Sequence, residues 1–184
     1  MGIAVALEAR SRGHDVTLLL GRGAMEPPET LTGCCERFET TADLQQLLGL
    51  RFPSADLLIM AAAVSDFIPQ AVDLSTKRSR TDGPLHLSLE PAPDLVAAVA
   101  SSKRADQCVV GFALESSSDL TERASAKLLR KGLDAIVANP LETMDADCIS
   151  GTLITADGVA REAPPGLSKP DFAAWLLDRI AAQT

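Results

Sequence analysis

The sequence predicts an α/β domain: a Rossmann-like, mostly parallel sheet with helices on both faces and a C-terminal β-hairpin, from which the first strand is missing. Short, continuous apolar runs are typical of strands buried on both faces. They alternate with stretches of helical periodicity, which favours a parallel sheet. The length of 184 residues suits one domain spanning 1–184, able to bury roughly 70% of the surface of its unfolded chain.

The N-terminal half starts with a helix that we expect to end at Gly13, since glycine commonly follows the last helical turn. Val16–Leu20 and Leu57–Ala63 are predicted buried strands, and Thr41 is predicted to cap a helix through Leu50. A Rossmann-like fold usually begins with a strand and a glycine-rich turn, whereas this sequence begins with a helix. We therefore expect a further strand near the middle of the sheet.

In the C-terminal half, the alternation over Leu85–Leu89 predicts a half-exposed strand, and Pro93 and Asp94 are predicted to open a helix to about Ser102. The remaining predicted strands are Cys108–Ala113 and Ala135–Ala138, and a hairpin is predicted from 151–155 and 159–162. A helix is predicted at Asp119–Lys131, stopped by Gly132, and a closing helix is predicted to follow residues 168–170 and to run through Ala182.

Composition excludes several classes of function. The net charge is −8, which disfavours polymeric nucleic acid and anionic membranes as partners. Aromatic residues make up only 3% of the chain, too few for a base-stacking platform. The longest apolar run, Leu57–Val64, is far too short to span a bilayer, and residues 1–10 do not resemble a secretory signal. The four cysteines lack metal-binding spacing, so we expect free thiols, no metal site and a cytoplasmic protein.

Polar and small residues follow the predicted strands at their carboxyl ends, where α/β sheets bind ligands. Ala61 and Ala62 precede Asp66, which could hold a ribose hydroxyl or act as an ordinary turn residue. Phe112 lies between small neighbours that leave a ring face open for a base, although most such residues belong to the core. Asn139 ends the last predicted buried strand.

Two groups of cations could neutralise phosphate oxygens. Lys77 lies in a basic stretch with Arg78 and Arg80, either a phosphate-binding arm or a solvated loop. Lys127 and Lys131 lie four residues apart on one face of a predicted helix. They form either a phosphate clamp or an ordinary basic helix terminus.

The motifs "AAVSDF" (Ala62–Phe67), "PDLV" (Pro93–Val96), "GFALE" (Gly111–Glu115) and the stretch Ala124–Asn139 occur in this order. Together they resemble phosphopantothenoylcysteine synthetase, and the similarity covers nearly the whole chain. The resemblance implies a ligase of coenzyme A biosynthesis that joins phosphopantothenate to cysteine through an acyl-nucleotide intermediate. It further implies CTP or ATP as co-substrate, with CTP favoured, Mg²⁺, a homodimer and a decarboxylase as possible partner.

The resemblance also implies roles for individual residues. Lys77 is then the catalytic candidate and a nucleotide ligand, and Asn139 lines the substrate site. The remaining nucleotide-binding candidates are Ala61, Ala62, Asp66, Pro93, Asp94, Leu95, Val96, Phe112, Lys127 and Lys131.

The sequence departs from the family in Arg78 and Arg80, where lysines are usual, and in Ala92, where asparagine is usual. The family also has a strand, a glycine-rich turn and an asparagine-bearing loop before the position of Met1, so we expect an N-terminally truncated domain. Alternatives are a nucleotide-binding module impaired in catalysis, an inert fragment, or an oxidoreductase. The last is disfavoured because no dinucleotide-type glycine motif follows a strand.

Overall fold

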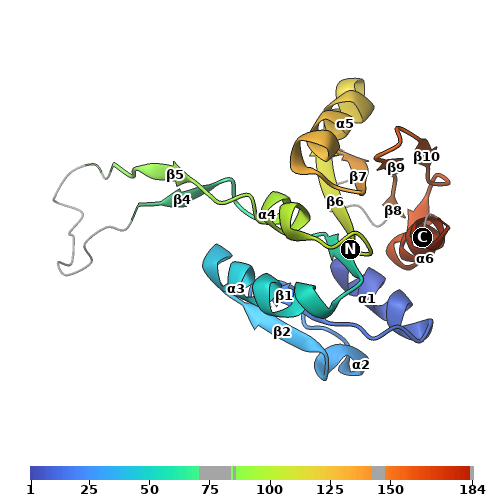
Figure 1. Cartoon of the computed structure of the whole chain (residues 1–184), viewed down its shortest axis with the longest axis horizontal. Helices are drawn as coiled ribbons and strands as arrows, with labels where there is room; N and C mark the ends of the chain where they lie inside the picture. Colours follow the sequence, from blue (N-terminus) through green and yellow to red (C-terminus); the bar gives the residue numbers. More distant parts are fainter. Residues whose placement is uncertain (71–83, 85, 142–147, 183–184) are drawn as a thin grey trace.

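The computed structural model describes residues 1–70, 84, 86–141 and 148–182. Its main sheet has five strands in the order β10-β9-β7-β6-β3 (Figure 1). The strands β3, β6 and β7 are parallel, and β9 and β10 form an antiparallel hairpin beside β7. The predicted α/β fold class is confirmed. The strands span Leu57–Met60 (β3), Cys108–Glu115 (β6), Ala135–Pro140 (β7), Thr152–Thr155 (β9) and Ala160–Glu162 (β10).

Helices cover both faces of this sheet because alternate side chains of its strands enter different apolar clusters. On one face, Val109 of β6 packs with Ala124 and Leu128 of α5. On the other face, Val110 packs with Phe172 of α6 and with residues of α1. The helices span Gly2–Ser11 (α1), Leu95–Ser102 (α4), Leu120–Lys131 (α5) and Lys169–Ala181 (α6).

A second, two-stranded parallel sheet consists of β1 (Leu18–Gly21) and β2 (Cys35–Phe38). The short helix α2 (Glu29–Thr32) lies between these strands in sequence, and α3 (Thr41–Arg51) follows them. The sequence analysis missed β2, because its residues Cys-Glu-Arg-Phe lack the continuous apolar character of the buried strands.

The two sheets share their covering helices although β1 and β3 are not paired with each other. Leu44 and Leu48 of α3 form a cluster that also contains Leu19 of β1 and Leu58 of β3. On the opposite face, α1 contacts clusters that include residues of both strands. Within the described residues β3 pairs only with β6, and β1 only with β2.

An antiparallel arm, made of β4 (Phe67–Pro69) and β5 (Leu89–Pro91), extends away from the body of the molecule (Figure 1). The half-exposed strand predicted at Leu85–Leu89 is thus displaced, and Leu89 begins β5. The remaining elements are the two-stranded pair β8 (Cys148–Ile149) and β11 (Leu167–Ser168), and the short helices η1 (Phe52–Ser54) and η3 (Ser117–Asp119).

Two predicted helix starts are shifted by capping. Thr40, rather than Thr41, caps α3, because Asp43 stands three residues after Thr40 and returns a hydrogen bond to its backbone N–H. Asp94 is the N-cap of α4, so Pro93 lies before the helix instead of in its first turn. Gly132 ends α5 in the left-handed conformation at φ +66°, as its sequence position predicted.

All four cysteines are free thiols, as expected. Burial and the neighbouring Asp134 carboxylate raise the pKa of the Cys108 thiol to about 11. At pH 8 about one Cys108 thiol in a thousand is therefore ionised. None of the helices in the described ranges has the length and apolar content needed to cross a bilayer.

Iodoacetamide at pH 8 is expected to modify the exposed Cys148 well before Cys108, because the thiolate is the reactive form and Cys108 is also shielded. Mass spectrometry of tryptic peptides during a time course measures the order of labelling. Equal alkylation rates for the two cysteines in folded protein would contradict the described burial of Cys108 and its raised pKa.

Candidate functional site

One flank of α5 carries a row of charges spaced four residues apart: Asp119 at the N-cap, then Arg123, Lys127 and Lys131. Ala124 and Leu128, on the adjacent side of the helix, are buried against the sheet, so the row lies along the margin of this buried face. A four-residue spacing places neighbouring members within reach of each other, and Arg123 Nε lies 3.6 Å from Asp119 Oδ2.

Glu115 is the buried carboxylate of this region. It is the last residue of β6, and its side chain is only 8% exposed. Lys127 Nζ lies 2.5 Å from Glu115 Oε1, and Arg123 reaches the other carboxylate oxygen at 4.0 Å. A carboxylate removed from water requires a cationic partner, which Lys127 provides.

Asp94 connects α4 to α5. One of its oxygens accepts the capping hydrogen bond from Ala97 N, and Lys131 Nζ lies 3.0 Å from the other. This pair brings the predicted pocket residues of Pro93–Val96 next to Lys131. Leu95 is buried in the cluster with Leu44 and Leu48 of α3, and Val96 is half-buried against the cluster that contains Leu128 of α5.

Asp94→Ala is expected to lower the free energy of unfolding by about 1–2 kcal/mol, mostly through loss of the helix cap. Asp94→Asn keeps a good capping residue and removes only a half-exposed ion pair, so its cost should be below about 1 kcal/mol. Urea denaturation of both variants measures the difference. Equal losses would show that capping by Asp94 contributes nothing.

The segment after β3 is open to solvent. Ala62 and Asp66 are exposed and Ala61 is half-buried. Ala92 N donates to Asp66 O at 2.8 Å, so the base of the arm lies directly beside the start of α4. The backbone of Asp66 thus lies near the start of α4, where Asp94 is paired with Lys131.

Phe112 stands apart from the lysines. It lies three residues before Glu115 on β6, so the two side chains leave opposite faces of the sheet. Phe112 is half-buried and packs against the cluster formed with α1 and α6. A nucleotide that contacts both Phe112 and Lys127 must therefore bind across the end of β6.

Asn139 lies in β7, with its side chain buried and 4% exposed. Its Nδ2 donates to Ser150 O at 2.9 Å, and its buried Oδ1 accepts no hydrogen bond from the residues that the structure describes. Lys77, Arg78 and Arg80 lie outside the described residues.

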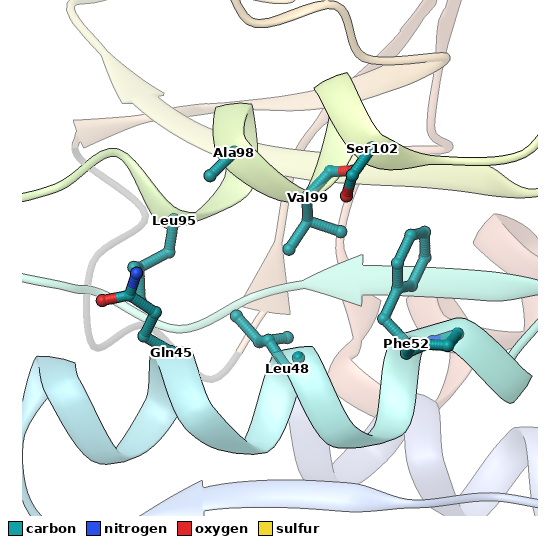
Figure 2. A pocket seen from close by; sticks show the side chains of 9 residues that line it. Gln45, Leu48, Phe52, Leu95, Ala98, Val99 and Ser102 are labelled. Carbon is teal, nitrogen blue, oxygen red and sulfur yellow. The ribbon is translucent and has the colours of Figure 1, made fainter.

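An apolar groove of about 280 Å³ lies between α3 and α4 (Figure 2). Leu48 and Phe52 face Leu95 and Val99 across it. Leu95 is its only contribution from the predicted site residues, so the groove is separate from the lysine pairs. No group of three or more His, Cys, Asp or Glu residues in the described ranges is arranged to hold a metal ion.

Sequence reasoning did not identify Arg123, nor the pairing of Glu115 with Lys127. The four-residue spacing of Asp119, Arg123, Lys127 and Lys131 could have identified Arg123. The partners of the two lysines could not be found that way, because Glu115 comes from β6 and Asp94 from the start of α4.

Comparison with known proteins assigns the family. The profile of the DNA/pantothenate metabolism flavoprotein C-terminal domain matches residues 1–183. The chain is 33% identical over 186 residues to the coenzyme A biosynthesis bifunctional protein CoaBC of Bacillus subtilis, covering 99% of this chain and 45% of that protein.

A cysteine/cysteine sulfinic acid decarboxylase of an unknown prokaryotic organism is 37% identical over 142 residues, covering 77% of this chain and 39% of that protein. The chain thus spans less than half the length of these curated relatives. The crystal structure of the C-terminal domain of a CoaBC protein superposes with a TM-score of 0.80 at 27% identity, covering 99% of this chain and 81% of the other. The chain belongs to the DNA/pantothenate metabolism flavoprotein C-terminal domain family.

Proposed function

We propose that residues 1–184 form a single nucleotide-binding ligase domain that joins phosphopantothenate to cysteine in coenzyme A biosynthesis. The observation that carries this proposal is the fixing of two lysines on one helix: Lys127 is paired with Glu115 at the end of β6, and Lys131 with Asp94 at the start of α4, close to the backbone of Asp66. Two ammonium groups on one helix, next to an exposed strand end, suit the phosphates of a nucleotide. The similarity to CoaBC proteins supports the same assignment.

In the proposed reaction, the phosphopantothenate carboxylate attacks the α-phosphorus of the nucleotide, and pyrophosphate leaves. The cysteine amine then attacks the acyl carbon, expels the nucleoside monophosphate and loses a proton as the amide forms. Both steps depend on positioning and on neutralisation of phosphate charge. Lys127 and Lys131 hold the phosphates together with Lys77, which acts in catalysis.

The other residues of the site have binding roles in this proposal. Ala61 and Ala62 offer backbone groups, Asp66 a carboxylate for the ribose, and Phe112 a ring for the base. Pro93–Val96 lines the base pocket, and the buried amide of Asn139 lines the substrate site.

We propose CTP, in preference to ATP, as the nucleotide, on the basis of the family resemblance. Mg²⁺ enters with it, since this ion commonly binds through substrate phosphates and only one or two protein carboxylates. We also propose a cytoplasmic homodimer. In support, the arm exposes large apolar side chains, Phe67 at 54%, Leu87 at 58% and Leu89 at 56%, which a second copy could cover. A decarboxylase is the proposed functional partner.

A nucleotide-binding module that does not catalyse acylation is the second candidate. The observation that favours it is the edge of β3 with which no strand in the described part of the chain pairs; Ala61 and Ala62 directly follow β3 and lie half-buried and exposed. A site with an open sheet edge could bind phosphates and still fail to position the carboxylate for attack.

Pyrophosphate release separates these candidates. The protein is supplied with Mg²⁺, phosphopantothenate and either CTP or ATP, with and without cysteine. Release without cysteine supports the activation step, and ligation with cysteine supports the complete reaction. Nucleotide binding by calorimetry without any release favours the binding module. A folded protein that binds neither nucleotide overturns both.

A further inference from the structure

Both lysines that we assign to the phosphates already have carboxylate partners. Lys127 Nζ lies 2.5 Å from Glu115 Oε1, and Lys131 Nζ lies 3.0 Å from Asp94 Oδ2. A phosphate that approaches either ammonium must share it with the carboxylate. The affinity of this region for phosphates therefore depends on two acidic residues as well as on the lysines.

The two carboxylates differ in burial. The Glu115 side chain is 8% exposed, whereas that of Asp94 is 45% exposed. Water and salt screen an exposed charge strongly and a buried charge much less. Glu115 should therefore change the affinity for a polyanion more than Asp94 does. Its effect should also persist at salt concentrations that abolish the effect of Asp94.

Glu115 has one close cationic partner among the described residues, Lys127. Its other cation, Arg123, is 4.0 Å away and also lies 3.6 Å from Asp119. Lys127 is thus the close counterion of the buried carboxylate, and the pair fixes the ammonium at the end of β6.

We propose that Glu115 is a positioning residue that acts through Lys127: it holds the ammonium at the end of β6 and weakens its attraction for pyrophosphate, so that this product can leave. The inference rests on the proposed ligase function. An ammonium without a counterion would hold the nucleotide and the pyrophosphate product more tightly, and tight binding of both does not accelerate the chemical step. Slow product release would then limit turnover.

The test is binding of magnesium pyrophosphate, measured by titration calorimetry for the full chain and for Glu115→Gln, Lys127→Ala and the double variant. Glu115→Gln is expected to bind pyrophosphate about tenfold more tightly, equivalent to about 1.4 kcal/mol. In the Lys127→Ala background the same change should have no effect, because the residue through which Glu115 acts is absent.

Asp94→Asn is the matched control, since it removes the exposed carboxylate of the second pair. Its effect should stay below about threefold and disappear at about 0.5 M salt, while that of Glu115→Gln persists. In steady-state assays, Glu115→Gln should lower both kcat and the KM for nucleotide. A purely structural role of Glu115 would weaken binding and raise KM.

Unchanged or weaker pyrophosphate binding by Glu115→Gln, with wild-type binding intact, overturns this inference and leaves the proposed function standing. Wild-type protein that binds neither nucleotide nor pyrophosphate overturns both. If Glu115→Gln loses its cooperative thermal transition, Glu115→Leu provides the same neutralisation with a side chain suited to burial, and the same outcomes apply.

Discussion

Phe172→Ala is expected to lower the free energy of unfolding by about 3–5 kcal/mol, the largest stability effect we expect from a single substitution in this chain. Phe172 is fully buried in the cluster that joins α6 to the sheet, and its ring centroid lies 5.3 Å from that of Trp175. Close packing also surrounds it: a Cβ placed on Gly151 would come within 3.1 Å of its ring. The neighbouring segments therefore cannot simply collapse into the cavity.

Chemical denaturation with urea measures this loss. Phe67→Ala is the matched control, because it removes the same side chain from the arm, where Phe67 is 54% exposed, and should change stability by less than about 0.5 kcal/mol. Similar losses for both variants would mean that α6 is not packed as described.

Lys127→Ala is expected to have the largest functional effect, a decrease of about 100-fold in kcat/KM for nucleotide-dependent pyrophosphate release. In the proposed site, Lys127 is the lysine of α5 whose ammonium is held at the end of β6, by its contact with Glu115. The substitution also leaves a buried carboxylate without its close counterion, which costs some stability.

The double variant with Glu115→Gln separates these two effects, because it removes the unpaired charge and should restore stability but not activity. Arg130→Ala, on the exposed side of the same helix, controls for loss of a positive charge. Wild-type turnover by Lys127→Ala would exclude this lysine from the reaction.

Helices and buried strands could be predicted where a short stretch of sequence was enough to determine the structure. Gly132 ends α5 because a left-handed residue is required there, and the apolar run at Ala135 begins a strand buried on both faces. The strand β2 was not predictable in the same way. Its charged residues fit a half-exposed edge, and only pairing with β1 makes Cys35–Phe38 a strand.

For the candidate site, the sequence could propose individual residues but not the contacts between them. Local spacing placed Lys127 and Lys131 on one face of α5, and that arrangement is confirmed. The carboxylates that hold them come from β6 and the start of α4, so no local pattern could pair them. Strand alternation, applied to Phe112 and Glu115, would have placed these residues on opposite faces.

The division of the sheet has a consequence for how the protein opens. The amides of β6 lie between β3 and β7, so their exchange with solvent deuterium requires the whole five-stranded sheet to come apart. Among the described strands, β1 and β2 pair only with each other, and side-chain contacts, including the ion pair of Glu36 with Arg51 of α3, connect that pair to the rest. Residues 18–38 should therefore form a separate, less protected cooperative unit, whose opening leaves the exchange protection of β6 and β7 intact.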